Sequence, residues 1–269
     1  MRRIVVGYDG SGGARDALSL ARELARADDA ELLVACVWVS NPLLGDALAG
    51  AGGLPGWFAT RFTEVKAQLG GAAFRRFDLT NLSAPAALVE LAEIERAEII
   101  VLGSTHRGRV GRVVPGGVGE RLLEDAPCAV AIAPRGYAHG EHVGLGLLGV
   151  GYDGRDESKR ALGFARELAS RVQAELRLVT VVSDAGDTEV EPVTDAEHVH
   201  RRGDPAATLA AEGVELDLLV LGSRAFGPVL GTVLGEVSHE VMRTAPCPVI
   251  VVPRSSGARA RSRPPVAGR

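Results

Sequence analysis

Short aliphatic runs alternate with amphipathic segments along most of the chain. The first run, 4–8, is followed by Ala and Leu at three- and four-residue spacing with charged residues between them, which predicts a helix lying on a sheet. Repetition of this unit predicts an α/β fold with a doubly wound parallel sheet. In the first half we expect strands at 4–8, 31–39, 73–77, 98–102 and 129–133, and helices at 14–25, 57–69, 84–96 and 117–125.

The chain contains an internal repeat. The sequence VGYD at 6–9 returns at 150–153, an offset of 144, whereas APC at 126–128 returns at 245–247, an offset of only 119. The second copy is therefore 25 residues shorter between its first and fourth strands, where the first copy has a long loop and the helix 57–69. We expect two Rossmann-like domains, 1–135 and 145–254, with a linker at 136–144 and about one helix missing from the second domain.

Composition and charge narrow the function classes. The net charge is −4, and the segment after Pro253 holds five arginines and no acids, so the rest of the chain carries −9 and should repel nucleic acid. The segment 255–269 has no apolar periodicity, which predicts a disordered basic tail. Three cysteines do not form a disulfide framework. With no signal peptide and no apolar run of about 18 residues, we expect a cytoplasmic protein without membrane contact.

One repeated stretch carries the candidate chemistry. In 99–134, an aliphatic strand enters a loop rich in Gly and Arg, and the loop opens a helix. The stretch returns at 218–253. Glycine lets the backbone approach an anion, and the start of a helix presents unpaired N–H groups and a positive dipole end. Each half therefore carries a candidate phosphate-binding site.

Several motifs together resemble the universal stress protein family in its tandem form. They are VVGYDGS and GVGYDGR at the first strand of each half, VLGS before each glycine loop, and the closing APCAVAIAP and APCPVIVVP. The resemblance extends over 4–253. It implies two five-stranded parallel domains paired through their last strands within the chain, a non-catalytic role in the stress response, an unknown protein partner, and further association into a homodimer.

The resemblance also implies an adenine-nucleotide site in the first half. The family pattern has an acidic residue near the adenosine, a backbone contact from the second strand, and a loop reading Gly, two residues, Gly, nine residues, Gly and Ser or Thr. Here His106 replaces the second glycine and Gly117 replaces the hydroxyl. ATP is the expected ligand, with Mg²⁺ held by its phosphates. The implied residues are Asp9, Val37, Gly103, His106, Gly116 and Gly117. Separately from the resemblance, the loop carries Arg107, Arg109 and Arg112, whose charge makes each a candidate phosphate contact, with a solvated surface as the alternative.

The corresponding site in the second half is expected to be degenerate. Its residues are Asp153, Gly222, Ala225, Gly235 and Glu236. Ala225 replaces the second glycine, and Glu236 places a carboxylate where the phosphate-facing hydroxyl belongs. Two charges ~4 Å apart repel by ~4 kcal/mol at an effective dielectric constant of 20, which is enough to remove most of a micromolar affinity for a triphosphate.

Other interpretations of these residues stay open. Asp9 and Asp153 also suit a helix cap or a turn, and the glycine loops also suit plain strand–helix connections. The alternative function is a nucleotide-free scaffold that acts through protein contacts. A weak ATP hydrolase is the third hypothesis, which the sequence disfavours because no base is evident beside a water molecule.

Overall fold

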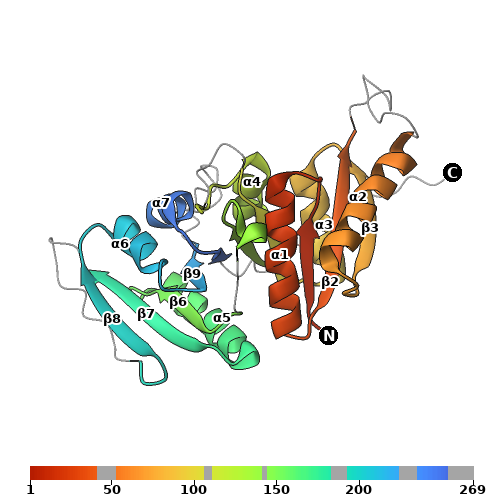
Figure 1. Ribbon diagram of the computed structural model, residues 1–269. Coiled ribbons are helices and arrows are strands. Elements are labelled where there is room, and N and C mark those ends of the chain that lie inside the picture. Colours follow the sequence, from red (N-terminus) through yellow and green to blue (C-terminus); the bar gives the residue numbers. More distant parts are fainter. Residues whose placement is uncertain (41–52, 106–110, 141–143, 183–192, 224–234, 254–269) are drawn as a thin grey trace, which may run out of the picture.

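The computed structural model describes residues 1–40, 53–105, 111–140, 144–182, 193–223 and 235–253. Its centre is a ten-stranded sheet with the order β3-β2-β1-β4-β5-β10-β9-β6-β7-β8, so each half contributes five adjacent strands (Figure 1). Pairing within each half is parallel, as the sequence predicts. The strands are β1 (Arg3–Gly7), β2 (Glu31–Val39), β3 (Arg75–Asn81), β4 (Ile99–Gly103), β5 (Ala129–Ala133), β6 (Leu147–Gly151), β7 (Glu175–Val182), β8 (Glu197–Arg202), β9 (Leu218–Gly222) and β10 (Val249–Val252).

Helices cover both faces of the sheet and form two apolar layers. Alternate residues of each strand belong to opposite layers, as Val5 and Val6 of β1 do. The first layer joins the sheet to α1, α2 and α5, and the second joins it to α3, α4, α6 and α7. The helices are α1 (Gly12–Ala27), α2 (Gly53–Leu69), α3 (Ala84–Glu95), α4 (Gly117–Asp125), α5 (Asp156–Val172), α6 (Pro205–Glu212) and α7 (Glu236–Thr244), with a 3₁₀ turn at Tyr137–His139.

The two halves meet through their last strands, which confirms the predicted pairing. β10 runs antiparallel to β5, with Ile250 opposite Ala131. An ionic cluster links the first layer across this junction. Arg171 of α5 donates to Glu98 at 2.7 Å, and its Nε lies 2.8 Å from Asp28 at the end of α1. The halves therefore form one continuous sheet (Figure 1).

The second half has no counterpart of α2 among its described residues, as the repeat offsets predict. Between β1 and β4 the first half contains α1, β2, α2, β3 and α3, whereas the second half contains α5, β7, β8 and α6 between β6 and β9. In the second half, the segment 183–197 stands where the first half has its long loop and α2, and its described part before β8, 193–196, leads directly into that strand. The strand β8 is an edge strand, and no described residue between β7 and β8 forms a helix.

Three local features differ from the expectation. The helix expected at 57–69 begins four residues earlier, at Gly53. The third strand is Arg75–Asn81 rather than 73–77, because an edge strand pairs on one side only and tolerates polar residues such as Asp78 and Thr80. The start of the predicted linker is tied to α1: Asp16 accepts hydrogen bonds from the backbone N–H groups of Gly136 and Ala138, both at 2.8 Å. The expected tail at 255–269 lies outside the described residues. No described helix combines the length and apolarity that crossing a membrane would require.

Candidate functional site

A cavity of about 270 Å³ opens in the first half where β1, β2 and β4 end and α4 begins. In parallel α/β sheets this is the edge at which ligands bind, since the loops and helix starts gather there. Five residues of the implied site line the cavity together: Asp9, Val37, Gly103, Gly116 and Gly117. The fold therefore brings together residues that are up to 108 positions apart in the sequence.

Gly103 allows a close approach between two backbones beside the cavity. A Cβ atom at Gly103 would lie 1.8 Å from the carbonyl oxygen of Gly13, at the start of α1. In return, a Cβ atom at Gly13 would lie 2.4 Å from the carbonyl oxygen of Ser104. The end of β4 can therefore pack on the start of α1 only because both positions lack a side chain. This role for Gly103 is structural and is independent of any ligand.

The first turn of α4 presents open backbone to the cavity. Gly116 is the N-cap residue and supplies no side-chain hydrogen bond. A Cβ atom at Gly117 would meet no atom within 4 Å, and one at Gly116 would come nearest to Thr105, at 3.8 Å. Because the first N–H groups of a helix have no intrahelical partner, this turn can bind an anion without displacing a side chain.

Thr105 is a cavity residue that the sequence analysis missed. It lines the cavity, and its Cβ atom lies 3.8 Å from where a Cβ atom at Gly116 would be, so a hydroxyl-bearing side chain stands next to the start of α4. Its backbone N–H donates to Val114 at 2.8 Å, so the loop closes on itself and holds this position. The sequence could have indicated this residue, because it lies two positions after the end of β4 and ligand contacts commonly lie just beyond the carboxyl ends of parallel strands.

Asp9 performs the structural role that the alternative interpretation assigns to it. Its Oδ1 accepts the backbone N–H of Ser11 at 2.9 Å and so closes the turn before α1. Its carbonyl oxygen accepts a hydrogen bond from Arg61 of α2 at 3.3 Å. The Asp9 side chain is nevertheless exposed and lines the cavity, so turn closure leaves it available to a ligand.

Tyr8 lies beneath this turn and is anchored by α2. Its hydroxyl donates to Glu64 at 3.2 Å. Burial, reinforced by the negative charge of Glu64, raises the pKa of Tyr8 to about 12, so the phenol stays neutral at physiological pH. The tyrosine is therefore a fixed, uncharged wall of the cavity.

Val37 offers backbone groups beyond the end of β1. The last hydrogen bond between these two strands joins Tyr8 N–H to the carbonyl of Ala35 at 2.8 Å. Val37 lies two residues further along β2, so its backbone groups face the same side, where β1 has already ended. This position suits the backbone contact to a base that the resemblance implies.

Of the implied phosphate contacts, His106, Arg107 and Arg109 lie outside the described residues. Arg112 makes a contact that the sequence analysis did not predict. Its guanidinium donates to the carbonyl of Thr244 at 2.7 Å, at the end of α7 in the second half. The loop follows β4, which neighbours the central strand β5, so its far end lies beside the other half. Arg112 is a contact between the halves.

The second half has an equivalent cavity of about 350 Å³. Asp153, Gly222, Gly235 and Glu236 line it, whereas Ala225 lies outside the described residues. Glu236 is the first residue of α7, the position that Gly117 holds in α4. Glu157 is a further carboxylate in this wall. Asp9 is the only carboxylate among the described residues that line the first cavity, so the second cavity is the more acidic one.

The Asp153 turn is supported from within its own loop. Asp153 Oδ1 accepts the backbone N–H of Arg155 at 3.1 Å, and the guanidinium of the same arginine lies 3.8 Å from Oδ2. Elsewhere, no group of three or more His, Cys, Asp or Glu among the described residues is arranged to hold a metal ion. The structure therefore offers two cavities of one design with different charge.

Comparisons with known proteins agree with this architecture. The sequence pattern of the universal stress protein family matches residues 1–134 and 186–253. A universal stress protein of Mycobacterium tuberculosis is 27% identical, covering 93% of this chain and 99% of its own length. A second one from the same species is 30% identical, covering 62% of this chain and 65% of its own length. The crystal structure of a universal stress protein from Archaeoglobus fulgidus superposes with a TM-score of 0.65 at 20% identity, covering 94% of this chain and 96% of that one. The chain therefore belongs to the universal stress protein family, as a tandem member with one family region in each half.

Proposed function

We propose that this chain is a non-catalytic stress-response protein that binds an adenine nucleotide in its first half only. ATP would lie in the cavity between Asp9 and the first turn of α4, with its phosphates at Gly116 and Gly117 and its base beside the Val37 backbone. Mg²⁺ would arrive with the nucleotide, held by the phosphates. The second half would keep the shape of the site without binding a triphosphate.

The contrast between Gly117 and Glu236 carries this proposal. The open start of α4 fits a phosphate group because no side chain fills the space above its N–H groups. At the start of α7 the carboxylate of Glu236 already satisfies the helix dipole. It would also repel a phosphate ~4 Å away by ~4 kcal/mol at an effective dielectric constant of 20, a factor of about a thousand in affinity.

The test introduces the carboxylate of Glu236 at the corresponding position of the first half, which is Gly117. We expect one ATP per chain in isothermal titration calorimetry of the full-length protein with Mg²⁺. Gly117→Glu should weaken ATP binding at least a hundredfold without unfolding the protein, because the new side chain has open space and suits a helix start. Gly117→Gln has the same shape without the charge and is the matched control, which should bind ATP nearly as the original does.

The second half is tested by the opposite change. Glu236→Ser together with Ala225→Gly should create a second ATP site. If Gly117→Glu still binds ATP, or if the double change adds no site, the charge argument is wrong.

A nucleotide-free scaffold is the competing function. It predicts no heat and no thermal shift with ATP for any of these proteins, since a ligand that binds only the folded state must stabilise it. The non-catalytic part of the proposal rests on the cavity wall, in which Asp9 is the only carboxylate and no histidine occurs among the described residues. Phosphate release from ATP that depends on His106 would instead identify a hydrolase.

A further inference from the structure

The cavity of the second half keeps the apolar end of the first-half cavity. In the first half, a Cβ atom at Gly7 would lie 3.0 Å from a leucine of β4 and 3.2 Å from a leucine of α3. At its counterpart Gly151, a Cβ atom would lie 2.8 Å from Leu221 of β9 and 3.3 Å from Leu209 of α6. Both of these leucines line the second cavity. The same arrangement of two leucines around a strand-end glycine is therefore present in both halves.

The backbone contact at the end of the second strand is also retained. Tyr152 N–H donates to the carbonyl of Val179 at 3.0 Å, as the corresponding residues of the first half do. Val181 lies two residues further along β7 and lines the cavity, so it occupies the position that Val37 holds in β2. The second half therefore keeps the part of the cavity that would contact a planar ring.

The other end of the cavity has exchanged two glycines for carboxylates, and both carboxylates line it. Glu236 begins α7, whereas Gly117 begins α4. Glu157 is the counterpart of Gly13 at the repeat offset of 144. A Cβ atom at Gly13 would lie 2.4 Å from the carbonyl oxygen of Ser104, so the first half has no room for a side chain at this position. The second half has room for one, and it is an acidic one.

Both carboxylates belong to the place where β9 ends and α7 begins. Glu157 packs on Gly222, the last residue of β9, since a Cβ atom at Gly222 would lie 3.0 Å from the Cβ atom of Glu157. Ser238, in the first turn of α7, donates its hydroxyl to the carbonyl of Gly222 at 3.1 Å. This bond ties the start of α7, which carries Glu236, to the end of β9. The two negative charges therefore share the end of the cavity at which the first half presents open N–H groups.

The cations nearby do not neutralise this end. The guanidinium of Arg155 lies 3.8 Å from the carboxylate of Asp153, further towards the turn. Arg160 lies 3.7 Å from Glu157, and the nitrogen that faces this glutamate has no hydrogen-bond partner. No described residue forms an ion pair with Glu236. A cavity wall with an excess of carboxylates concentrates cations, so the expected ligand carries a positive charge.

The size of the cavity and the placement of its carboxylates favour an organic cation over a metal ion. Among the described residues, no three His, Cys, Asp or Glu side chains come together as a metal ion would require. The cavity has a volume of about 350 Å³, against about 270 Å³ in the first half, and one of its ends is apolar. A ligand with a ring at one end and a charge at the other matches both ends.

We propose that the second cavity binds a nucleoside-like cation, in which a planar ring is joined through a sugar to an ammonium group. The ring lies against Leu209 and Leu221 beside the backbone of Val181, and the ammonium group donates charge-assisted hydrogen bonds to Glu157 and Glu236. The orientation of the ring rests on the proposed function of the first half, whereas the preference for a positive charge does not.

The probe is the 5′-amino analogue of adenosine, which carries an ammonium group where AMP carries its phosphate. Adenosine and AMP have the same base and ribose and serve as the neutral and the negative comparison. In isothermal titration calorimetry of the full-length protein, the probe should bind one tight site per chain, about tenfold more tightly than adenosine. Hydrogen exchange should show that the probe protects the end of β9 and the start of α7, and that AMP does not.

Variants that keep the shape and remove the charge test the two carboxylates. Glu236→Gln and Glu157→Gln should each lower the affinity for the probe about tenfold and leave the affinity for adenosine unchanged. A merely structural effect would change both affinities together. Glu240→Gln, an exposed substitution one turn further along α7, is the matched control and should leave both affinities unchanged.

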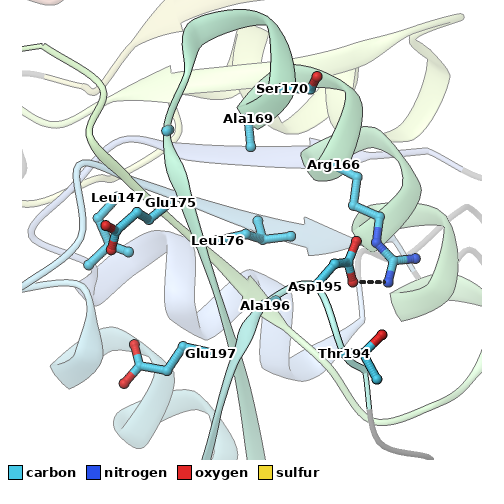
Figure 2. Close-up of a pocket in the computed structure, with 11 residues that line it drawn as sticks. Leu147, Arg166, Ala169, Ser170, Glu175, Leu176, Thr194, Asp195, Ala196 and Glu197 are labelled. Atoms are coloured by element: carbon cyan, nitrogen blue, oxygen red, sulfur yellow. Dashed lines mark hydrogen bonds and ion pairs between the residues drawn. The ribbon is translucent and has the colours of Figure 1, made fainter.

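A second hollow of the second half is the competing location for the probe. It has a volume of about 510 Å³ and lies at the opposite end of the sheet, where β7 and β8 begin. Figure 2 shows Glu175 on one side of it and the Arg166–Asp195 pair on the other. Glu175→Gln removes a carboxylate from this hollow and should leave binding of the probe unchanged.

The proposal is overturned if the probe does not bind, if it binds no more tightly than adenosine, or if neither Glu236→Gln nor Glu157→Gln weakens it. Loss of binding in Glu175→Gln, or protection confined to the first half, would equally refute it. The ATP titrations test the first half separately. A protein that binds ATP but not the probe refutes this inference alone, and a protein that binds the probe but not ATP refutes the proposed function alone.

Discussion

Arg171 should be the side chain whose loss most weakens the junction between the two halves. It comes from α5 of the second half and is 13% exposed, and it meets Asp28 and Glu98 of the first half at 2.8 and 2.7 Å. Asp28 is only 3% exposed. Removing one partner of a buried ion pair costs ~3–5 kcal/mol, since the other charge is left without compensation in a poorly solvated place.

The remaining contacts reduce that cost. Arg2 also lies 2.7 Å from Asp28, and it stays in place when Arg171 is changed. We therefore expect Arg171→Met, which keeps the length of the side chain, to lower the free energy of unfolding by about 2 kcal/mol. For a chain of this size that corresponds to a fall in Tm of about 5 °C.

Differential scanning calorimetry measures this effect, and the same helix provides a control. Arg166→Met breaks an exposed pair and should change the stability by less than about 0.5 kcal/mol. A double-mutant cycle of Arg171→Met with Asp28→Asn should give a coupling energy above about 1 kcal/mol. A change in Tm no larger than that of the control, or a coupling energy near zero, would refute the assignment of this ion pair to the junction.

Three further predictions concern the core and the backbone. Gly103→Ala should cost about 3 kcal/mol because its Cβ atom would overlap the carbonyl of Gly13, whereas Gly117→Ala, in open space, should be neutral or slightly stabilising in urea unfolding. Burial raises the pKa of the thiols of Cys36 and Cys247 to about 12, so both should resist thiol reagents at pH 8 in the folded protein. In the unfolded chain these thiols ionise with a pKa of about 9, whereas in the folded chain they stay neutral up to a pKa of about 12. The free energy of unfolding should therefore be highest below pH 9 and fall as the pH rises from 9 towards 12, which urea titrations at several pH values measure. Asp16→Ala should remove two hydrogen bonds to the segment after β5 and increase its amide hydrogen exchange, and unchanged exchange there would contradict the anchoring role.

Periodicity predicted the architecture well because each buried strand reads as an aliphatic run. Three elements have the predicted bounds: the strands Glu31–Val39 and Ala129–Ala133 and the helix Gly117–Asp125. The edge strand β3 was placed too early, since half of its side chains face solvent and leave no apolar run to find. The repeat offsets alone predicted the missing helix, because a deletion changes spacing whatever residues replace it.

The sequence predicted those residues of the candidate site that can be recognised from glycine spacing and from their position after a strand. Gly103 and Gly116 were found because glycine spacing survives in the sequence, and both line the cavity. Thr105 was missed because its proximity to Gly116 depends on how the loop folds back, with Thr105 N–H bonding to Val114. The contact of Arg112 with Thr244 could not be predicted, since it joins residues 132 positions apart across the junction of the halves. Whether ATP binds at this cavity stays a prediction.

The helix α2, which has no counterpart among the described residues of the second half, serves two places in the first half. Its Phe62 and Leu69 belong to the first apolar layer, and it also supports the ligand cavity from the side. Arg61 donates to the carbonyl of Asp9, and Glu64 accepts the hydroxyl of Tyr8, so one helix holds both residues at the end of β1. The same helix thus stabilises an apolar layer at one end of the sheet and a ligand wall at the other.

The turn itself closes in the same way in both halves, since Asp153 Oδ1 accepts the backbone N–H of Arg155 as Asp9 Oδ1 accepts that of Ser11. In the second half, however, the guanidinium of Arg155 lies 3.8 Å from Asp153 Oδ2, so a cation stands next to this carboxylate. We expect Glu236→Ser alone to give the second half less affinity for ATP than the first half shows, because the carboxylate of Glu157 stays in the wall of the second cavity. Calorimetry of this single variant beside the double variant measures the difference, and equal affinity in the two halves would contradict the argument from charge.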